Sequence, residues 1–262
     1  RVGARLELAR ARRTVEDALR DADRRKDEFL ATLAHELRNP LAPMRNALHA
    51  LRMAGPDAPT AGRLHAMMER QVNHMVRLVD DLLEVSRITR GRIELRMEQV
   101  DLGAVVRAAV ETSRPLIDAG GHELRIVLPA EPVTLRADPV RLAQVVGNLL
   151  NNAAQYTPRG GHIRLEARLC GNEVELEVRD DGVGIPQEML GKVFELFTQV
   201  DHTRAAAQGG LGIGLTLVRH IVELHGGRIE ASSPGQDRGS TFRVRLPVVQ
   251  GPRPAAAAEE PR

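Results

Sequence analysis

A histidine followed directly by a carboxylate, His35-Glu36, is the pair of residues in this sequence best suited to covalent chemistry. An imidazole nitrogen is a nucleophile, and an adjacent carboxylate is a base that can hold its proton. A solvent-exposed histidine on a helix is usually only a surface residue, so the pair needs support from other motifs. A His-Glu-x-x-His zinc motif is excluded because Asn39 stands where the second histidine is needed.

A second group of polar and glycine-rich segments lies far downstream. Asn148 and Asn152 are four positions apart in an apolar helical segment, so their amides share one helix face. Asp180-Asp181-Gly182-Val183-Gly184 follows a predicted strand, and Gly209-Gly210-Leu211-Gly212-Ile213-Gly214 precedes a predicted helix, where glycine amides suit phosphate groups. Each segment alone is also compatible with a polar stripe or an ordinary turn. Together they indicate a nucleotide site.

Two long helices are expected to position His35. Residues 1–54 predict one helix whose apolar residues recur at alternating steps of four and three, as in a coiled coil. On that register His35 faces outward. Pro40 is expected to stop the regular helix, with a bend at Pro40 and Pro43, because proline lacks an N–H and clashes with the preceding turn.

The second helix is predicted over residues 61–90, after a loop at 55–59 that is rich in proline and glycine. The same alternating step appears in this helix, at Leu64, Met68, Gln71, Met75, Leu78, Leu82 and Val85. A pair of such helices has too little core to be stable alone. We therefore expect a homodimer in which two hairpins form a four-helix bundle.

Residues 92–249 have a different pattern, in which short segments alternate apolar and polar side chains. Period-two alternation predicts antiparallel strands, here around 124–128, 163–169, 174–178 and 242–246. Helical stretches are expected near 101–119, 138–155 and 211–225. Hairpins and helices are mixed along the chain, so the predicted class is α+β.

Composition narrows the range of functions. Of the 262 residues 42% are hydrophobic and 27% are charged, which is typical of a globular protein, and no apolar run is long enough to span a membrane. The single cysteine, Cys170, rules out an internal disulfide and fits a reducing compartment. The net charge is only +2 and few aromatics accompany the arginines, so a nucleic-acid partner is not expected.

The segment Phe29 to Leu41 resembles the H-box of sensor histidine kinases of two-component systems, a bacterial signalling family. By this resemblance His35 is the phosphoacceptor, attacking through Nε2. Glu36 matches the acidic residue that holds the Nδ1 proton, a form of general-base help. Asn39 matches the position that orients water when such kinases dephosphorylate their partner.

The downstream motifs resemble, in the same order, the boxes of the family's Bergerat-type ATP-binding domain. The resemblance implies that Asn148 ligates Mg²⁺, that Asn152 contacts phosphates and that Asp180 accepts a hydrogen bond from the adenine amino group. The other residues implied in nucleotide binding are Tyr156, Gly182, Gly184, Phe194, Gly210, Gly212, Gly214, Leu215 and Thr241. Two features depart from the family: Gln155 replaces a common lysine, and Ala205-Ala206-Ala207 replaces polar lid residues.

The expected architecture is a helical-hairpin dimerisation domain followed by an α/β-sandwich ATP-binding domain. The expected boundaries are 1–25 for a coiled-coil signalling linker, 26–91 for the dimerisation and phosphotransfer domain, 92–249 for the catalytic domain and 250–262 for a flexible tail.

The resemblance implies a protein-histidine kinase that uses ATP and Mg²⁺, phosphorylates His35 and passes the phosphoryl group to an aspartate of a response-regulator receiver domain. An upstream sensor domain and a cytoplasmic location are also expected. Phosphatase activity and a membrane anchor in the full-length protein stay open. The alternatives are a clamp ATPase with the same ATP-binding fold, or a dimeric scaffold with weak catalysis.

Overall fold

The computed structural model describes residues 31, 33, 34, 37–53, 60–89, 94–196, 198 and 212–249. These residues separate into two compact units, with the boundary between Leu83 and Glu84. The first unit is helical, and the second contains both strands and helices. His35 and Glu36 lie outside the described residues, as do the predicted helix before residue 31, the loop at 55–59, the lid at 200–208 and the tail.

The helical unit contains a helix over residues 37–53 and the first part of helix α2, Ala61–Thr89. The prediction that Pro40 stops the regular helix was wrong, because helical structure continues from Pro40 through Pro43 to residue 53. Each proline removes one N–H donor, which is one hydrogen bond of the helical ladder. Pro40 is buried, and the neighbouring residues keep their helical conformation, so the helix continues through this position.

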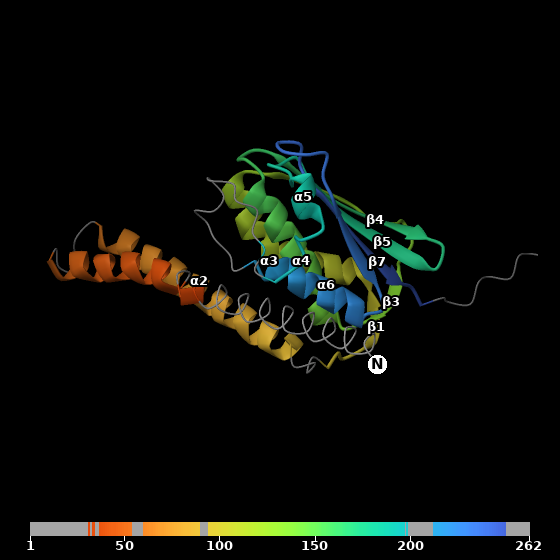
Figure 1. Cartoon of the computed structure of the whole chain (residues 1–262), viewed down its shortest axis with the longest axis horizontal. Helices are drawn as coiled ribbons and strands as arrows, with labels where there is room; N and C mark the ends of the chain where they lie inside the picture. The colour runs from red at the N-terminus through yellow and green to blue at the C-terminus, as the bar shows by residue number, and fades with distance from the viewer. Residues whose placement is uncertain are drawn as a thin grey trace, which may run out of the picture. The chain divides into compact units, whose positions relative to one another are not determined.

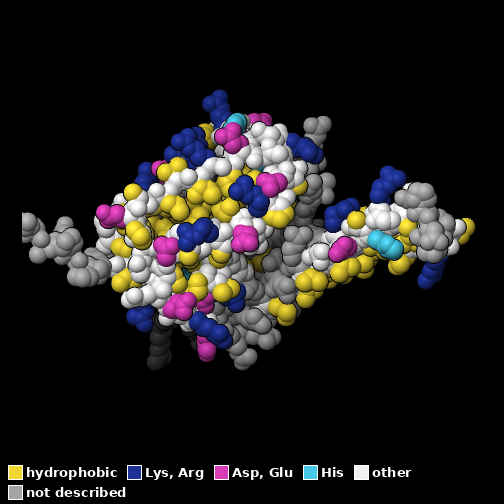
Figure 2. All heavy atoms as spheres, turned by 180° about the vertical axis from the view of Figure 1, so that it is seen from behind, with side chains coloured by type: hydrophobic (Ala, Val, Ile, Leu, Met, Phe, Trp, Pro, Cys, Tyr) yellow, Lys and Arg dark blue, Asp and Glu magenta, His cyan; other side chains and the backbone are white. Residues whose placement is uncertain are grey.

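The alternating pattern of α2 forms the inner face of the helical unit. Leu78 is buried and Leu64, Met75 and Leu82 are half-buried, as expected for a seam against the first helix. A second apolar stripe lies one residue further along and is exposed, at Val72, Val76, Val79 and Leu83. The first helix adds exposed Leu41 and Leu48. Figure 2 shows these hydrophobic side chains gathered along one edge of the helical unit.

The second unit is built on a five-stranded sheet with the strand order β2-β4-β5-β7-β6. A separate two-stranded sheet joins β1 to β3. The strands are β1 Glu98–Asp101, β2 Glu123–Val127, β3 Thr134–Ala137, β4 His162–Cys170, β5 Glu173–Asp180, β6 Arg228–Ser232 and β7 Thr241–Pro247. The predicted strands therefore exist, while β1, β3 and β6 were not predicted.

One strand pairing differs from the prediction of antiparallel strands. β2 pairs with β4 in parallel, with Glu123 opposite His162 and Val127 opposite Glu166, while the other pairs of the main sheet are antiparallel. A parallel pair needs a long crossover, and helix α4, Pro139–Tyr156, lies in the connection between these strands. Period-two alternation identifies a half-buried strand but carries no information about its direction.

Three helices cover one face of the main sheet: α3 Leu102–Gly120, α4 and α6 Gly214–Leu224 (Figure 1). The inward side chains of β4, β5 and β7 alternate along each strand and pack against these helices in one core, together with Val145, Leu149 and Leu217. A short helix α5, Gln187–Leu190, follows β5. This arrangement is the α+β sandwich expected from the sequence, in which burial of one sheet face supplies the core.

The N-terminus of α4 is fixed by Asp138. Its carboxylate accepts hydrogen bonds from the backbone N–H groups of Val140, Arg141 and Arg96. Burial alone would raise the pKa of this carboxyl, but the three backbone donors lower its pKa overall. His225, at the C-terminus of α6, accepts from the Asp138 N–H through Nε2, with its Nδ1 paired to the Ile221 carbonyl. Helices α4 and α6 are thereby joined at one end.

None of the helices in the described ranges combines the length and the apolar character that crossing a bilayer requires.

Candidate functional site

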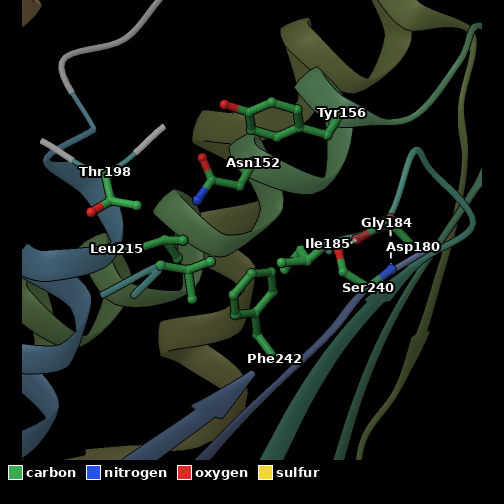
Figure 3. A pocket seen from close by; sticks show the side chains of 10 residues that line it. Asn152, Tyr156, Asp180, Gly184, Ile185, Thr198, Leu215, Ser240 and Phe242 are labelled. Carbon is green, nitrogen blue, oxygen red and sulfur yellow. Dashed lines mark hydrogen bonds between the residues drawn. The ribbon is translucent and has the colours of Figure 1, made fainter. Parts of the chain in front are cut away.

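A pocket opens between helix α4, the end of β5 and the start of β7 (Figure 3). The empty space inside it, open solvent at its mouth included, is about 570 Å³. Its lining combines apolar walls with a few polar groups: Asn152, Tyr156, Asp180, Gly184, Ile185, Val193, Thr198, Leu215, Ser240 and Phe242. Five of the residues predicted for nucleotide binding therefore lie in one pocket, namely Asn152, Tyr156, Asp180, Gly184 and Leu215.

Among the described residues of this lining Asp180 is the only carboxylate, and it is almost fully buried. Its Oδ1 accepts from the backbone N–H groups of Gly182 and Ser240, at 2.9 and 3.1 Å. Its Oδ2 accepts from the Ser240 hydroxyl at 2.5 Å. Burial raises the pKa of Asp180 above its ordinary value, against the lowering effect of these three donors. The side chain is fixed in place, and each carboxylate oxygen has more than one lone pair to offer.

Two glycines let the backbone pass close to other chain segments at this edge of the pocket. A Cβ on Gly182 would lie 2.4 Å from the Tyr156 carbonyl oxygen. Gly184 has a φ of +71°, and a Cβ there would lie 2.1 Å from the Gly235 carbonyl oxygen. Side chains at these positions would push the loop out of place, which supplies a physical reason for the glycine spacing.

Helix α4 brings Asn152 and Tyr156 to the pocket, one turn apart on the same face. Figure 3 shows both side chains extending from the same side of this helix, with Leu215 and Phe242 below them in this view. Burial raises the pKa of the Tyr156 hydroxyl, so it stays neutral and can donate a hydrogen bond. Asn148, one turn earlier, is half-buried and does not line this pocket.

The apolar walls come from Ile185, Leu215 and Phe242. Phe194 supports one wall from behind, with its ring edge-on to Phe242 at a centroid distance of 6.3 Å and an angle of 82°. Such edge-to-face pairs are a favourable geometry for aromatic rings. The structure therefore places Phe194 in the core beside the pocket, where it shapes a lining residue without lining the pocket itself.

The sequence reasoning selected Thr241 and missed its neighbours Ser240 and Phe242, which line the pocket. The period-two pattern of β7 contained the signal that distinguishes them. Phe242, Val244 and Leu246 were recognised as one face, and Ser240 shares their parity. Thr241 has the opposite parity and lines a different pocket on the other face of the sheet.

The glycine-rich segment is described only in part. Gly212 has a φ of +65°, a left-handed conformation that favours glycine, and Gly214 begins helix α6. Leu215, in the first turn of α6, reaches the pocket. Gly210, Phe197 and the alanines at 205–207 lie outside the described residues.

Of the three catalytic residues predicted in the helical unit, Asn39 is the one that lies among the described residues. Asn39 is exposed on the helix over residues 37–53, with the half-buried Leu37 two positions before it. The first helix therefore places Asn39 on its solvent side. The outward orientation predicted for His35 lies outside the described residues.

The pocket is chemically suited to a flat heterocycle that carries an amino group. Apolar side chains from α6 and β7 can contact the faces of a ring, while buried Asp180 at the floor offers carboxylate lone pairs to an N–H donor. Amide and hydroxyl groups of Asn152, Tyr156 and Thr198 supply polar contacts elsewhere in the lining. A purine with an exocyclic amino group could use both features, the apolar side chains for its ring and the Asp180 carboxylate for its amino group.

Comparison with known protein families covers both units. Residues 137–250 match the family of histidine kinase-, DNA gyrase B- and HSP90-like ATPases. Residues 25–91 match the His Kinase A (phospho-acceptor) domain. The chain is 36% identical over 230 residues to the alginate biosynthesis sensor protein KinB of Pseudomonas aeruginosa, an alignment of 86% of this chain. It spans only 38% of the length of KinB.

Solved structures show the same architecture. The Acinetobacter baumannii histidine kinase AdeS is 26% identical, with a TM-score of 0.63 over 82% of this chain and 98% of that one. Full-length ShkA in complex with AMPPNP is 28% identical, with a TM-score of 0.64 over 88% of this chain and 48% of that one.

Proposed function

Because this chain belongs to the sensor histidine kinases of two-component systems, we propose that it is the catalytic core of such a kinase, transferring the γ-phosphoryl group of ATP to His35. The next acceptor is an aspartate of a response-regulator receiver domain. The single observation that carries this proposal is the pocket that gathers Asn152, Tyr156, Asp180, Gly184 and Leu215 around a buried carboxylate.

In this proposal ATP is the nucleotide substrate, and ShkA, a structural relative, was crystallised with AMPPNP, a non-hydrolysable ATP analogue. Asp180 accepts a hydrogen bond from the adenine amino group, and the side chains of Ile185, Leu215 and Phe242 contact the ring. Asn152 donates its amide N–H to the phosphates. The glycines that precede α6 supply backbone N–H groups near the same phosphates.

A magnesium ion, when bound, neutralises charge on the phosphates and favours their oxygen atoms as ligands. Asn148 fits this role by its chemistry, since its amide carries an oxygen and lies one helical turn before Asn152 on the same face of α4. Asn148 is half-buried, so part of its side chain is accessible to solvent.

The histidine acts as the nucleophile. The Nε2 lone pair of neutral His35 forms a bond to the γ-phosphorus while the bond from that phosphorus to the bridging oxygen of ADP breaks. Glu36 accepts the Nδ1 proton as positive charge develops on the ring, which is general-base assistance of ordinary magnitude. Asn39, which is exposed on the helix over residues 37–53, is proposed to orient a water molecule when the kinase dephosphorylates its response regulator.

We also propose that the chain works as a homodimer. The stripe at Val72, Val76, Val79 and Leu83 repeats with steps of four, three and four and stays between 44 and 52% exposed within one chain. An apolar stripe with that spacing stabilises a helix only when another helix covers it. A second hairpin supplies that helix and completes a four-helix bundle.

The boundaries 1–25, 26–91, 92–249 and 250–262 are kept as the proposed linker, phosphotransfer domain, catalytic domain and tail. The core is proposed to work in the cytoplasm, where ATP is available. It receives its signal from a sensor domain upstream of the linker.

The test of the proposed activity is incubation of the whole chain with γ-labelled ATP and Mg²⁺, followed by treatment of the labelled protein with acid and with base. Phosphohistidine is lost in acid and survives base, so label with that stability is expected. Hydrolysis of ATP without any protein label would instead identify a clamp ATPase. Neither label nor hydrolysis would identify a non-catalytic scaffold, in line with Gln155 and the alanines at 205–207.

A further inference from the structure

A second pocket lies on the other side of the Asp180–Ser240 pair from the nucleotide pocket. Its empty space, open solvent included, is about 650 Å³, and of the described residues only Asp180 and Ser240 belong to both linings. Three arginines and several hydroxyl groups dominate this second lining, which consists of Arg179, Asp180, Ser232, Ser233, Pro234, Arg238, Gly239, Ser240, Thr241 and Arg243. We call it the arginine pocket.

The arginine pocket lies at the end of a sheet face that carries several ion pairs between strands. On this outer face Glu175 pairs with both Arg168 and Arg245, at 2.5 and 2.7 Å. Arg228 pairs with Glu173 and Arg243 pairs with Glu177, each at 2.6 Å. Of the three arginines of the pocket, Arg243 is therefore already neutralised by a cross-strand carboxylate.

At the next outward-facing position of β5, Arg179, no opposite charge stands across from the arginine. Arg179 on β5 stands opposite Arg164 on β4 and opposite Thr241 on β7, so it meets a like charge on one side and a hydroxyl on the other. Like charges directly opposite each other in a sheet are unfavourable. Arg164 has its own partner, Glu166, at 2.6 Å. The guanidinium group of Arg179 has no hydrogen bond or ion pair with any other residue in the described part of the chain.

Arg238, in the loop that leads into β7, is exposed and likewise has no hydrogen bond or ion pair within the described ranges. The nearby acids do not cancel the charge of these two arginines. Asp180 is occupied by the donors of Gly182 and Ser240, and Asp181 pairs with His162 at 2.8 Å. Asp237, next to Arg238 in sequence, is exposed and does not line the pocket.

The loop that carries Arg238 is held firmly in place. Gly239 has a φ of +71°, and a Cβ there would lie 2.0 Å from the Asp180 carbonyl oxygen. The Ser233 hydroxyl donates to the Gly239 carbonyl at 2.7 Å and accepts from the N–H of Ile185 at 3.0 Å. Arg238 therefore extends from a loop that is fixed on both sides, as a preorganised binding group requires.

We propose that the arginine pocket binds a small phosphate anion, held by the guanidinium groups of Arg179 and Arg238 and by the hydroxyl of Thr241. Guanidinium groups present planar sets of donors that match phosphate oxygens, and hydrogen bonds between charged partners are the stronger kind. A tetrahedral anion can use donors that arrive from β5, from the loop and from β7 at once. This site is separate from the nucleotide pocket and does not depend on the proposed kinase activity.

The test is a titration of the isotope-labelled whole chain with inorganic phosphate, followed by NMR of the Arg179 and Arg238 Nε–Hε groups and of the Thr241 amide. Ionic strength is held constant with chloride, and saturating ADP occupies the nucleotide pocket. The expected result is saturable shifts of these signals that persist in ADP. Shifts that vanish in ADP would assign the binding to the nucleotide pocket and overturn the proposal, as would the absence of saturable shifts.

Two variants and a matched control complete the test. Arg179→Gln and Arg238→Gln should each weaken phosphate binding at least about tenfold, because each removes charge-assisted hydrogen bonds. Arg125→Gln removes the same charge from the same sheet face, on β2, outside the pocket lining, and should leave the affinity within about twofold. An equal loss of phosphate affinity in all three variants would show that the positive charge of the whole sheet face attracts phosphate without a specific site, and would overturn the proposal. A failed titration would leave autophosphorylation untouched, so the two proposals fail separately.

Discussion

The Ser240 hydroxyl donates a hydrogen bond to Oδ2 of Asp180 at 2.5 Å, while the Ser240 backbone N–H donates to Oδ1 of the same carboxylate at 3.1 Å. The residue directly before β7 thus holds both oxygens of a carboxylate at the end of β5. The pair forms the floor of the nucleotide pocket and separates it from the arginine pocket. Any base that enters the first pocket meets an acceptor whose orientation is already fixed.

The first prediction concerns the choice of base. Asp180→Asn should weaken ATP binding about tenfold or more, because it replaces a charged acceptor with an N–H donor that faces the adenine amino group. The same donor is matched to the carbonyl oxygen of guanine, so the ratio of GTP affinity to ATP affinity should rise. Isothermal titration with both nucleotides measures the change. An unaltered ratio would contradict the role assigned to Asp180.

The second prediction uses neighbouring asparagines on α4. Asn152→Ala should raise the KM for ATP, since Asn152 lines the pocket, and Asn148→Ala should raise the Mg²⁺ concentration needed for half-maximal activity. Asn151→Ala is the matched control, because Asn151 is also half-buried on this helix but does not line the pocket. Equal defects in all three variants would point to a general loss of helix stability.

How much of this site the sequence predicts depends on the kind of information each residue carries. Asn152, Asp180 and Gly184 were recognisable because an unusual residue type stands at a regular spacing. Ser240 and Phe242 were missed because a serine before a strand and a phenylalanine within it are ordinary. Their importance comes from β7 lying next to β5, which is a long-range pairing. The parity of β7 did mark the correct face, but the resemblance to the family implied Thr241.

The fold likewise contains elements that the local sequence pattern predicts and elements that it does not. Helix α4 was predicted at 138–155 and is found at Pro139–Tyr156, where Asp138 caps its start. The parallel direction of β2 was not predictable from alternation. The short strands β1 and β3 gave too little pattern to detect, with four residues each. In the helical unit the tertiary setting carried the helix through Pro40, against its local preference.

The third prediction concerns the dimer. Val76→Glu places a charge in the middle of the exposed stripe of α2, where the wild-type side chain is 52% exposed in one chain. A buried, unpaired carboxylate at a helix interface is costly, so the variant should dissociate to monomers at concentrations where the wild type is dimeric. Multi-angle light scattering measures the mass.

The control for this variant is Val140→Glu, which makes the same change at a more exposed position, 73%, on α4. A carboxylate in the first turn of that helix is electrostatically favourable, so the mass of this variant should match the wild type. A dimeric Val76→Glu protein would contradict the proposed interface.

The fourth prediction concerns pH. The pKa of Asp138 is lower in the folded protein than its ordinary value of 3.8, because backbone donors outweigh the effect of burial. Its contribution to stability is therefore fully present above pH 3.8 and is lost as the pH falls through the folded value. Asp138→Ala should reduce the free energy of unfolding by about 0.5–2 kcal/mol at pH 7, and the difference should shrink below pH 3.8.

Urea unfolding of both proteins across this pH range checks the expectation. Asp118→Ala serves as the control, since its carboxylate is 62% exposed and lies near the C-terminus of α3. A pH-independent difference between wild type and Asp138→Ala would rule out the charged cap.

The central claim is that one histidine accepts the phosphoryl group, and the most direct measurement is the site and amount of label after incubation with γ-labelled ATP and Mg²⁺. The comparison is between wild type, His35→Gln and His49→Gln, which changes an exposed histidine on the same helical unit. The account predicts base-stable, acid-labile label on wild type and His49→Gln, located at His35 by mass spectrometry, and none on His35→Gln. Base-stable label that persists in His35→Gln would contradict it.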